Sequence, residues 1–105
     1  MTGHLSAADL GAERLGERAT LVQFSSAFCQ PCRATRRVLR EVSAMIEGVA
    51  HLEIDAEEHF ALARSLRIAG TPTVLVLDAR GRVVRRALGQ PRRVDVIAAL
   101  GAAVA

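Results

Sequence analysis

Two cysteines stand at the junction between a strand-like and a helix-like segment, and this arrangement restricts the fold more than any other feature. Residues 20–25 (TLVQFS) are β-branched and apolar, which is typical of a buried strand. Residues 31–47 repeat apolar side chains at intervals of three and four, which predicts a long helix. Pro31 suits the first turn of that helix, where a missing N–H costs nothing. Cys29 and Cys32 therefore lie where a strand leads into a helix.

The remaining chain alternates strands and helices in a βαβ rhythm. Four residues, 78–81, separate the last two strands, so these strands form a hairpin. We predict an α/β fold, with a mixed β-sheet and two helices on each face. Besides the elements already named, we expect strands at 2–5, 49–55, 73–77 and 82–88 and helices at 6–18, 57–66 and 94–104. The last helix has an apolar stripe formed by Val94, Ile97, Leu100 and Val104.

Composition narrows the classes of function. The 105 residues, 50% hydrophobic and 24% charged, indicate one domain over residues 1–105 that folds alone. Aromatic residues make up 3%, which leaves no platform for stacking bases. The net charge of +3 comes from arginine without lysine, and we interpret it as surface charge rather than a nucleic-acid site. No segment approaches the roughly 18 apolar residues of a membrane helix, and the first residues do not resemble a signal peptide, so we expect a cytoplasmic location and no membrane partner.

The position of the two cysteines predicts their chemistry. A helix N-terminus carries partial positive charge and free N–H groups, which favour a thiolate at Cys29. Arg33 and Arg36 would add positive charge. Cys29 is therefore the expected nucleophile. Cys32, one turn further in, is the expected resolving thiol that attacks a mixed disulfide.

Several segments together resemble thioredoxin over nearly the whole chain. They are 21–24 (LVQF), 28–32 (FCQPC), 54–55 (ID), 68–73 (IAGTPT) and Gly89 after the last strand. The resemblance implies a thioredoxin-like three-layer fold and a monomeric thiol–disulfide oxidoreductase that needs no cofactor or metal. Its partners would be disulfide-containing proteins, with a thioredoxin reductase or a low-molecular-weight thiol as electron donor.

The same resemblance assigns a substrate-binding surface. Thr71-Pro72 looks like the cis-proline loop that faces the cysteines in this family, so we expect a cis peptide bond there. The backbone of Thr71 would then pair with an extended substrate chain, a form of strand addition. Phe28, Gln30 and Pro31 would complete this surface.

Three residues depart from the family pattern. Phe28 stands where tryptophan is usual, which keeps an apolar cover but loses an N–H donor. Gln30 replaces glycine and enlarges the substrate surface. Gln23 replaces a buried aspartate, and an amide cannot accept a proton as a carboxylate does, so we expect slower proton removal from Cys32.

Two other kinds of function fit the same residues. Cys-x-x-Cys is half of a tetrahedral zinc site, but His4, His51 and His59 have no spacing that completes it, which leaves only a metal cluster shared between two chains. The chain could instead be a binding or adaptor module that retains the cysteines without turnover. Arg33, Arg37 and Arg40 share a helix face that suits an acidic partner.

Overall fold

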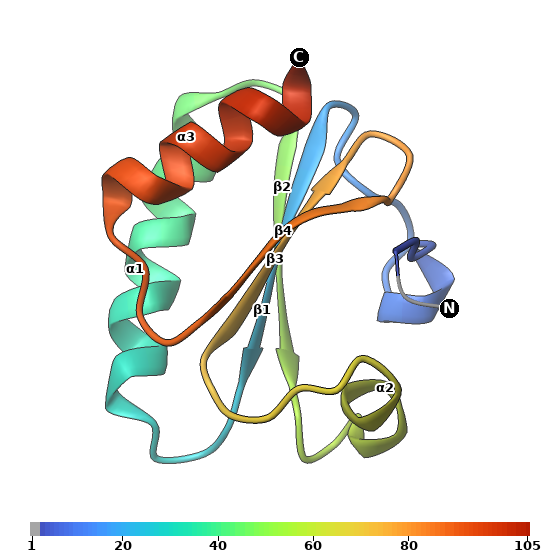
Figure 1. Cartoon of the computed structure of the whole chain (residues 1–105), viewed down its shortest axis with the longest axis vertical. Coiled ribbons are helices and arrows are strands. Elements are labelled where there is room, and N and C mark those ends of the chain that lie inside the picture. The colour runs from blue at the N-terminus through green and yellow to red at the C-terminus, as the bar shows by residue number, and fades with distance from the viewer. Residues whose placement is uncertain (1–2) are drawn as a thin grey trace.

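A four-stranded mixed β-sheet forms the centre of the computed structural model, which describes residues 3–105 (Figure 1). The strand order is β2-β1-β3-β4; β1 and β2 are parallel, and β3 runs antiparallel to both its neighbours. The strands are β1 (Ala19–Ser25), β2 (Val49–Asp55), β3 (Thr73–Asp78) and β4 (Val83–Leu88). The mixed sheet and its antiparallel hairpin at one edge confirm the sequence prediction.

Helices cover both faces of this sheet, as predicted, but unequally. The long helices α1 (Gln30–Met45) and α3 (Arg93–Val104) lie together on one face, as Figure 1 shows. Within residues 3–105, the other face holds the six-residue helix α2 (Phe60–Ser65) and a single 3-10 turn, η1 (Ala8–Leu10). The prediction of two helices on each face is therefore correct for one face only.

Aliphatic side chains fill both sides of the sheet, as the low aromatic content requires. Alternate residues of a strand point to opposite faces, so β1 contributes to both cores. The core beneath α1 and α3 contains Ala19, Leu21, Leu39, Val42, Val74, Val76, Val96, Ala99, Leu100 and Ala103. The core on the α2 face contains Leu5, Leu10, Val22, Phe24, Ile54, Leu66, Leu75 and Leu77.

The helix predicted over residues 6–18 is wrong, because only η1 forms there. Ser6 and Asp9 cap this turn reciprocally: the Ser6 N–H donates to Asp9 Oδ2 (2.9 Å) and the Asp9 N–H to Ser6 Oγ (3.1 Å). Gly11 then takes a left-handed conformation (φ 69°), which ends the turn. Leu10 of this segment is therefore buried without a continuous helix being formed.

The first predicted strand, at 2–5, is reduced to a single β-bridge between His4 and Arg82; Thr2 lies outside the described residues. The Leu5 N–H donates to the Gly81 carbonyl (2.8 Å), so this segment contacts the β3–β4 turn. Gly81 has φ +88°, and a Cβ there would lie 2.0 Å from the Leu5 carbonyl oxygen. Only glycine fits this contact.

Two helices differ from their predicted pattern. α2 begins at Phe60 rather than at residue 57, because Asp55 Oδ1 accepts the N–H groups of Glu57 and Glu58 and holds them in a turn. α3 has the expected span, but its buried residues are Val96, Ala99, Leu100 and Ala103, whereas Val94 and Ile97 of the predicted stripe are exposed. Because α3 has apolar residues on every side, its sequence does not select the face that is buried.

Candidate active site

A disulfide bond joins Cys29 and Cys32 at the start of α1, with a Cα–Cα distance of 5.2 Å. Cys29 is the N-cap residue, and its Sγ accepts the Cys32 N–H at 3.2 Å. Cys29 is half-buried, whereas Cys32 is only 1% exposed. An incoming group therefore has access to the Cys29 sulfur, which already faces a helix N–H donor.

The arginines near the cysteines differ in their surroundings. Arg33 is exposed and has no ion pair among residues 3–105. Arg36 instead donates to Glu53, from Nε to Oε1 at 2.6 Å and from Nη2 to Oε2 at 2.7 Å. This pairing neutralises Arg36, so the expectation that both arginines add positive charge at Cys29 applies only to Arg33.

The Thr71–Pro72 peptide bond is cis, as the resemblance implied. Thr71 Oγ1 and Ser26 Oγ form a hydrogen bond of 2.7 Å, which holds this loop against the segment that leads from β1 to Cys29. On its other side the Pro72 carbonyl accepts the Gly89 N–H at 2.8 Å. These two hydrogen bonds join the cis-proline loop to the segment before Cys29 and to the end of β4.

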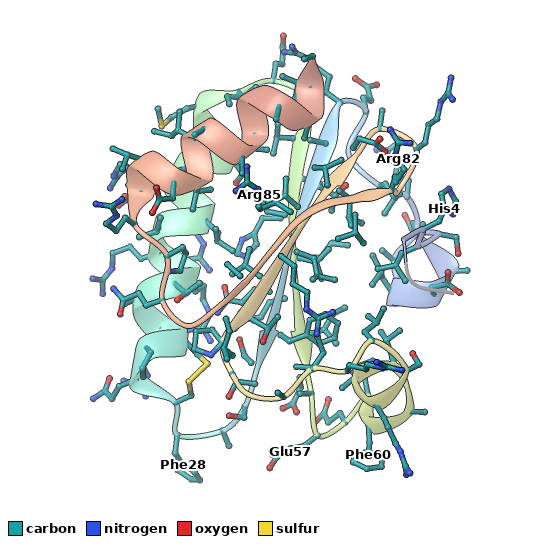
Figure 2. The ribbon with its side chains drawn as sticks, in the orientation of Figure 1. His4, Phe28, Glu57, Phe60, Arg82 and Arg85 are labelled. Atoms are coloured by element: carbon teal, nitrogen blue, oxygen red, sulfur yellow. A yellow bond between two sulfur atoms is a disulfide. The ribbon has the colours of Figure 1, made fainter. Side chains whose placement is uncertain are left out.

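The side chains around the disulfide are mostly exposed. Figure 2 shows Phe28 at the same end of the molecule as the disulfide, pointing outward. Phe28 has φ 59° and is 104% exposed, so it does not cover the sulfurs as expected; its backbone conformation turns the ring into solvent. Gln30 and Pro31 are exposed in the first turn of α1. A groove lined partly by Phe60, Ile68 and Thr71 extends from the cis-proline loop to α2.

Gln23 lies beneath α1 and belongs to a series of hydrogen bonds that reaches the surface. Its Nε2 donates to the Cys32 carbonyl (2.9 Å) and to Ser25 Oγ (3.0 Å). Ser25 Oγ donates in turn to Glu53 Oε2 at 2.7 Å. No sequence motif singles out Ser25 or Glu53. The sequence signal that could have pointed to Ser25 is the alternation of polar residues along the otherwise apolar strand β1.

The charge states of Glu53 and His51, near these hydrogen bonds, are determined by the groups around them. The Arg36 guanidinium, with help from the Ser25 hydroxyl, holds the pKa of Glu53 below its usual range despite partial burial. Burial lowers the pKa of His51, which keeps its imidazole neutral near pH 7. Glu53 is thus an ionised acceptor at the solvent end of this series of hydrogen bonds.

No helix within residues 3–105 has the length and apolar character to cross a membrane. The same residues contain no group of three or more His, Cys, Asp or Glu side chains arranged to hold a metal ion.

Comparisons with known proteins agree with this geometry. Residues 7–104 match the family model of the thioredoxin-like domain. The chain belongs to the thioredoxin-like domain family. It is 32% identical over 72 residues to thioredoxin H2-1 of rice, covering 69% of this chain and 51% of that protein. It is 34% identical over 74 residues to thioredoxin of Staphylococcus aureus, covering 69% and 70%.

Solved structures share the fold. Thioredoxin-2 of the malaria parasite superposes with a TM-score of 0.76 at 17% identity, over 97% of this chain and 96% of that one. Thioredoxin NaTrxh of Nicotiana alata gives a TM-score of 0.74 at 24% identity, over 85% and 76%. At these identities the likeness shows the fold alone. With its Cys-x-x-Cys pair, the thioredoxin fold supports thiol–disulfide oxidoreductase chemistry in general terms.

Proposed function

We propose that this protein is a dithiol–disulfide oxidoreductase that exchanges disulfides with protein substrates. One observation carries the proposal: half-buried Cys29 is bonded to buried Cys32 at a helix N-terminus, and the loop of cis-Pro72 is hydrogen-bonded to the segment that leads to Cys29. The two sulfurs differ in access, which is what a sequential exchange requires. One must meet the substrate, and the other must act only afterwards.

In the reducing direction the Cys29 thiolate attacks a substrate disulfide and forms a mixed disulfide, releasing one substrate sulfur as a thiolate. The Cys32 thiol then loses its proton and attacks Cys29 Sγ. The second substrate sulfur leaves with the bonding pair and takes up a proton, so two electrons pass to the substrate and the Cys29–Cys32 disulfide forms. The Cys32 N–H at 3.2 Å from Cys29 Sγ stabilises the starting thiolate.

Substrate chains would dock across Phe28, Gln30, Pro31 and the Thr71–Pro72 loop. A thioredoxin reductase or a low-molecular-weight thiol would restore the dithiol. We further propose that the protein acts in the cytoplasm as a monomer with one domain. No nucleic acid, membrane, metal or organic cofactor enters the proposed reaction.

The experiment is an equilibration of the purified protein with graded thiol/disulfide buffers, with alkylation and mass measurement of the free thiols. Absence of Trp and Tyr makes fluorescence uninformative. We expect one reversible two-electron transition for the wild type and none for Cys29→Ser or Cys32→Ser. Absence of any disulfide in the wild type at every buffer ratio would contradict the proposal.

An adaptor function is the second candidate, and one observation favours it. Arg33, Arg37 and Arg40 are exposed on α1 and form no ion pair among residues 3–105, so they are free to contact an acidic partner. In an adaptor, Cys29→Ser would preserve the cellular function. In the oxidoreductase it would abolish that function even where partner binding persists.

A further inference from the structure

We propose that Gln23 Oε1 accepts a hydrogen bond from the Cys32 thiol once the disulfide is reduced, and that this bond favours the dithiol over the disulfide. The inference rests on the proposed function and concerns how the balance between its two redox states is set. Gln23 would thus influence the resolving cysteine as a neutral acceptor, without taking its proton.

The first observation is an unsatisfied acceptor in the core. Gln23 is 0% exposed, and in this disulfide-bonded structure its Oε1 has no hydrogen-bond partner among residues 3–105. Leaving a buried acceptor unpaired destabilises the folded protein. Buried polar groups are almost always paired, so this exception calls for a partner that the oxidised molecule does not offer.

The second observation is that the orientation of the Gln23 amide is determined by its neighbours. Its Nε2 faces the Cys32 carbonyl at 2.9 Å, which can only accept. Its other contact, Ser25 Oγ, gives its own hydrogen to ionised Glu53 and therefore also accepts from Gln23. Rotating the amide would place Oε1 against these acceptors, so Oε1 stays on the unpaired side.

Reduction supplies a donor at the residue that Gln23 already contacts. The disulfide takes up two electrons and two protons to become two thiols, and the S–H of Cys32, which is 1% exposed, needs a partner inside the protein. The Gln23 amide already reaches the backbone of Cys32 through Nε2, so its Oε1 lies on the same short side-chain group. An amide oxygen accepts from a thiol but does not deprotonate it, which stabilises Cys32 in its protonated form.

The charged groups near Gln23 have their own partners in this structure. Arg36 on α1 and Glu53 on β2 form a bidentate pair, and His51 on β2 is neutral near pH 7. His51 Nε2 also has no hydrogen-bond partner within the described residues 3–105, but His51 forms no hydrogen bond to Cys32 or to Gln23. Gln23 is therefore the acceptor that the structure connects to the resolving cysteine.

The test compares wild type, Gln23→Leu and Ser25→Ala in glutathione redox buffers, with the disulfide fraction read by alkylation and mass. Gln23→Leu should shift the equilibrium about fivefold towards the disulfide, the value for one net hydrogen bond of about 1 kcal/mol. Ser25→Ala removes the hydrogen bonds between Gln23, Ser25 and Glu53 but keeps Gln23 Oε1. It should therefore change the equilibrium between dithiol and disulfide less than twofold. A Gln23→Leu value within twofold of wild type would overturn the inference.

Urea unfolding of both redox forms, followed by circular dichroism, gives an independent measure. The Nε2 contacts exist in the oxidised form and their loss affects both forms, whereas an Oε1 bond to the thiol exists only in the reduced form. Gln23→Leu should therefore destabilise the reduced form more, by the same fivefold factor in the unfolding constant. Equal losses in the two forms would show that Gln23 is merely structural.

If Gln23→Leu does not fold, Gln23→Met keeps the length of the side chain and replaces the amide oxygen. A direct signature is the S–H stretching band of reduced protein, which should lie at lower frequency in wild type than in Gln23→Met; identical bands would contradict the bond. The two proposals fail differently. Without the proposed function the wild type itself shows no reversible transition, whereas failure of the Gln23 bond leaves a transition that Gln23→Leu does not move.

Discussion

Glu53 is the residue that connects the buried hydrogen bonds of Gln23 and Ser25, beneath α1, to solvent. It pairs with Arg36 on its outer side and accepts from Ser25 on its inner side. These contacts exist only with the carboxylate ionised, and they hold the pKa of Glu53 below its usual range. Its contribution to stability is therefore complete above the ordinary glutamate pKa of about 4.3 and is lost as the pH falls through the lower pKa of the folded protein.

We predict that Glu53→Gln lowers the free energy of unfolding by about 1 kcal/mol at pH 7, because a partly buried ion pair and one charged hydrogen bond are weakened. The difference from wild type should shrink as the pH falls below about 4, where wild-type Glu53 is also losing its charge. Urea unfolding at pH 7 and pH 3 measures both values. Glu58→Gln is the control, since Glu58 is exposed and takes no part in the hydrogen bonds that link Gln23, Ser25 and Glu53. A difference in unfolding free energy between wild type and Glu53→Gln that is as large at pH 3 as at pH 7 would contradict this role of the Glu53 carboxylate.

At the scale of elements, the β3–β4 turn is held against the N-terminal segment by Gly81. A side chain there would meet the Leu5 carbonyl, and the positive φ is itself unfavourable for other residues. We predict that Gly81→Ala destabilises the protein by about 2 kcal/mol or more. Urea unfolding followed by circular dichroism measures the change.

Gly101 provides the opposite case on α3. It lies inside the helix, and a Cβ there meets nothing within 4 Å. Gly101→Ala should therefore stabilise the protein by about 0.5–1 kcal/mol through helix propensity. Similar effects at both glycines would show that backbone context does not separate them.

At the scale of the whole molecule, α1 both carries the cysteines and contributes Leu39 and Val42 to one core. Leu39 is 0% exposed in that core, about two helical turns from Cys32. We predict that Leu39→Ala costs 2–5 kcal/mol of unfolding free energy, about equally in the oxidised and reduced forms. The glutathione equilibrium should then stay within twofold of wild type.

The control on the same helix is Met45→Ala, because Met45 is 60% exposed and its loss should change stability by no more than about 0.5 kcal/mol. A redox equilibrium that moves with Leu39→Ala would show that core packing and disulfide chemistry are coupled through α1, contrary to our expectation.

Much of the molecule was predictable from local pattern. Apolar strand runs, the three-and-four spacing of α1 and the turn at 78–81 each depend on residues close in sequence, so β1 to β4 and their hairpin were predicted to within a residue or two, whereas the strand at 2–5 was not found. The position of Cys29 and Cys32 at a strand-to-helix junction was predicted in the same way. Their roles in exchange, and those of the substrate-binding residues, stay predictions.

Tertiary structure decided the rest, because the deciding contacts join residues far apart in the chain. The parallel register of β1 and β2 places Gln23 opposite Glu53, which makes the series of hydrogen bonds to Cys32 possible. Packing selected the buried face of α3, where apolar residues on all sides left the choice open. The amino-acid sequence by itself therefore determined the elements and the cysteine motif through local physical preferences. Only the folded structure decided which polar groups meet beneath α1, because register and helix packing are set by the whole core.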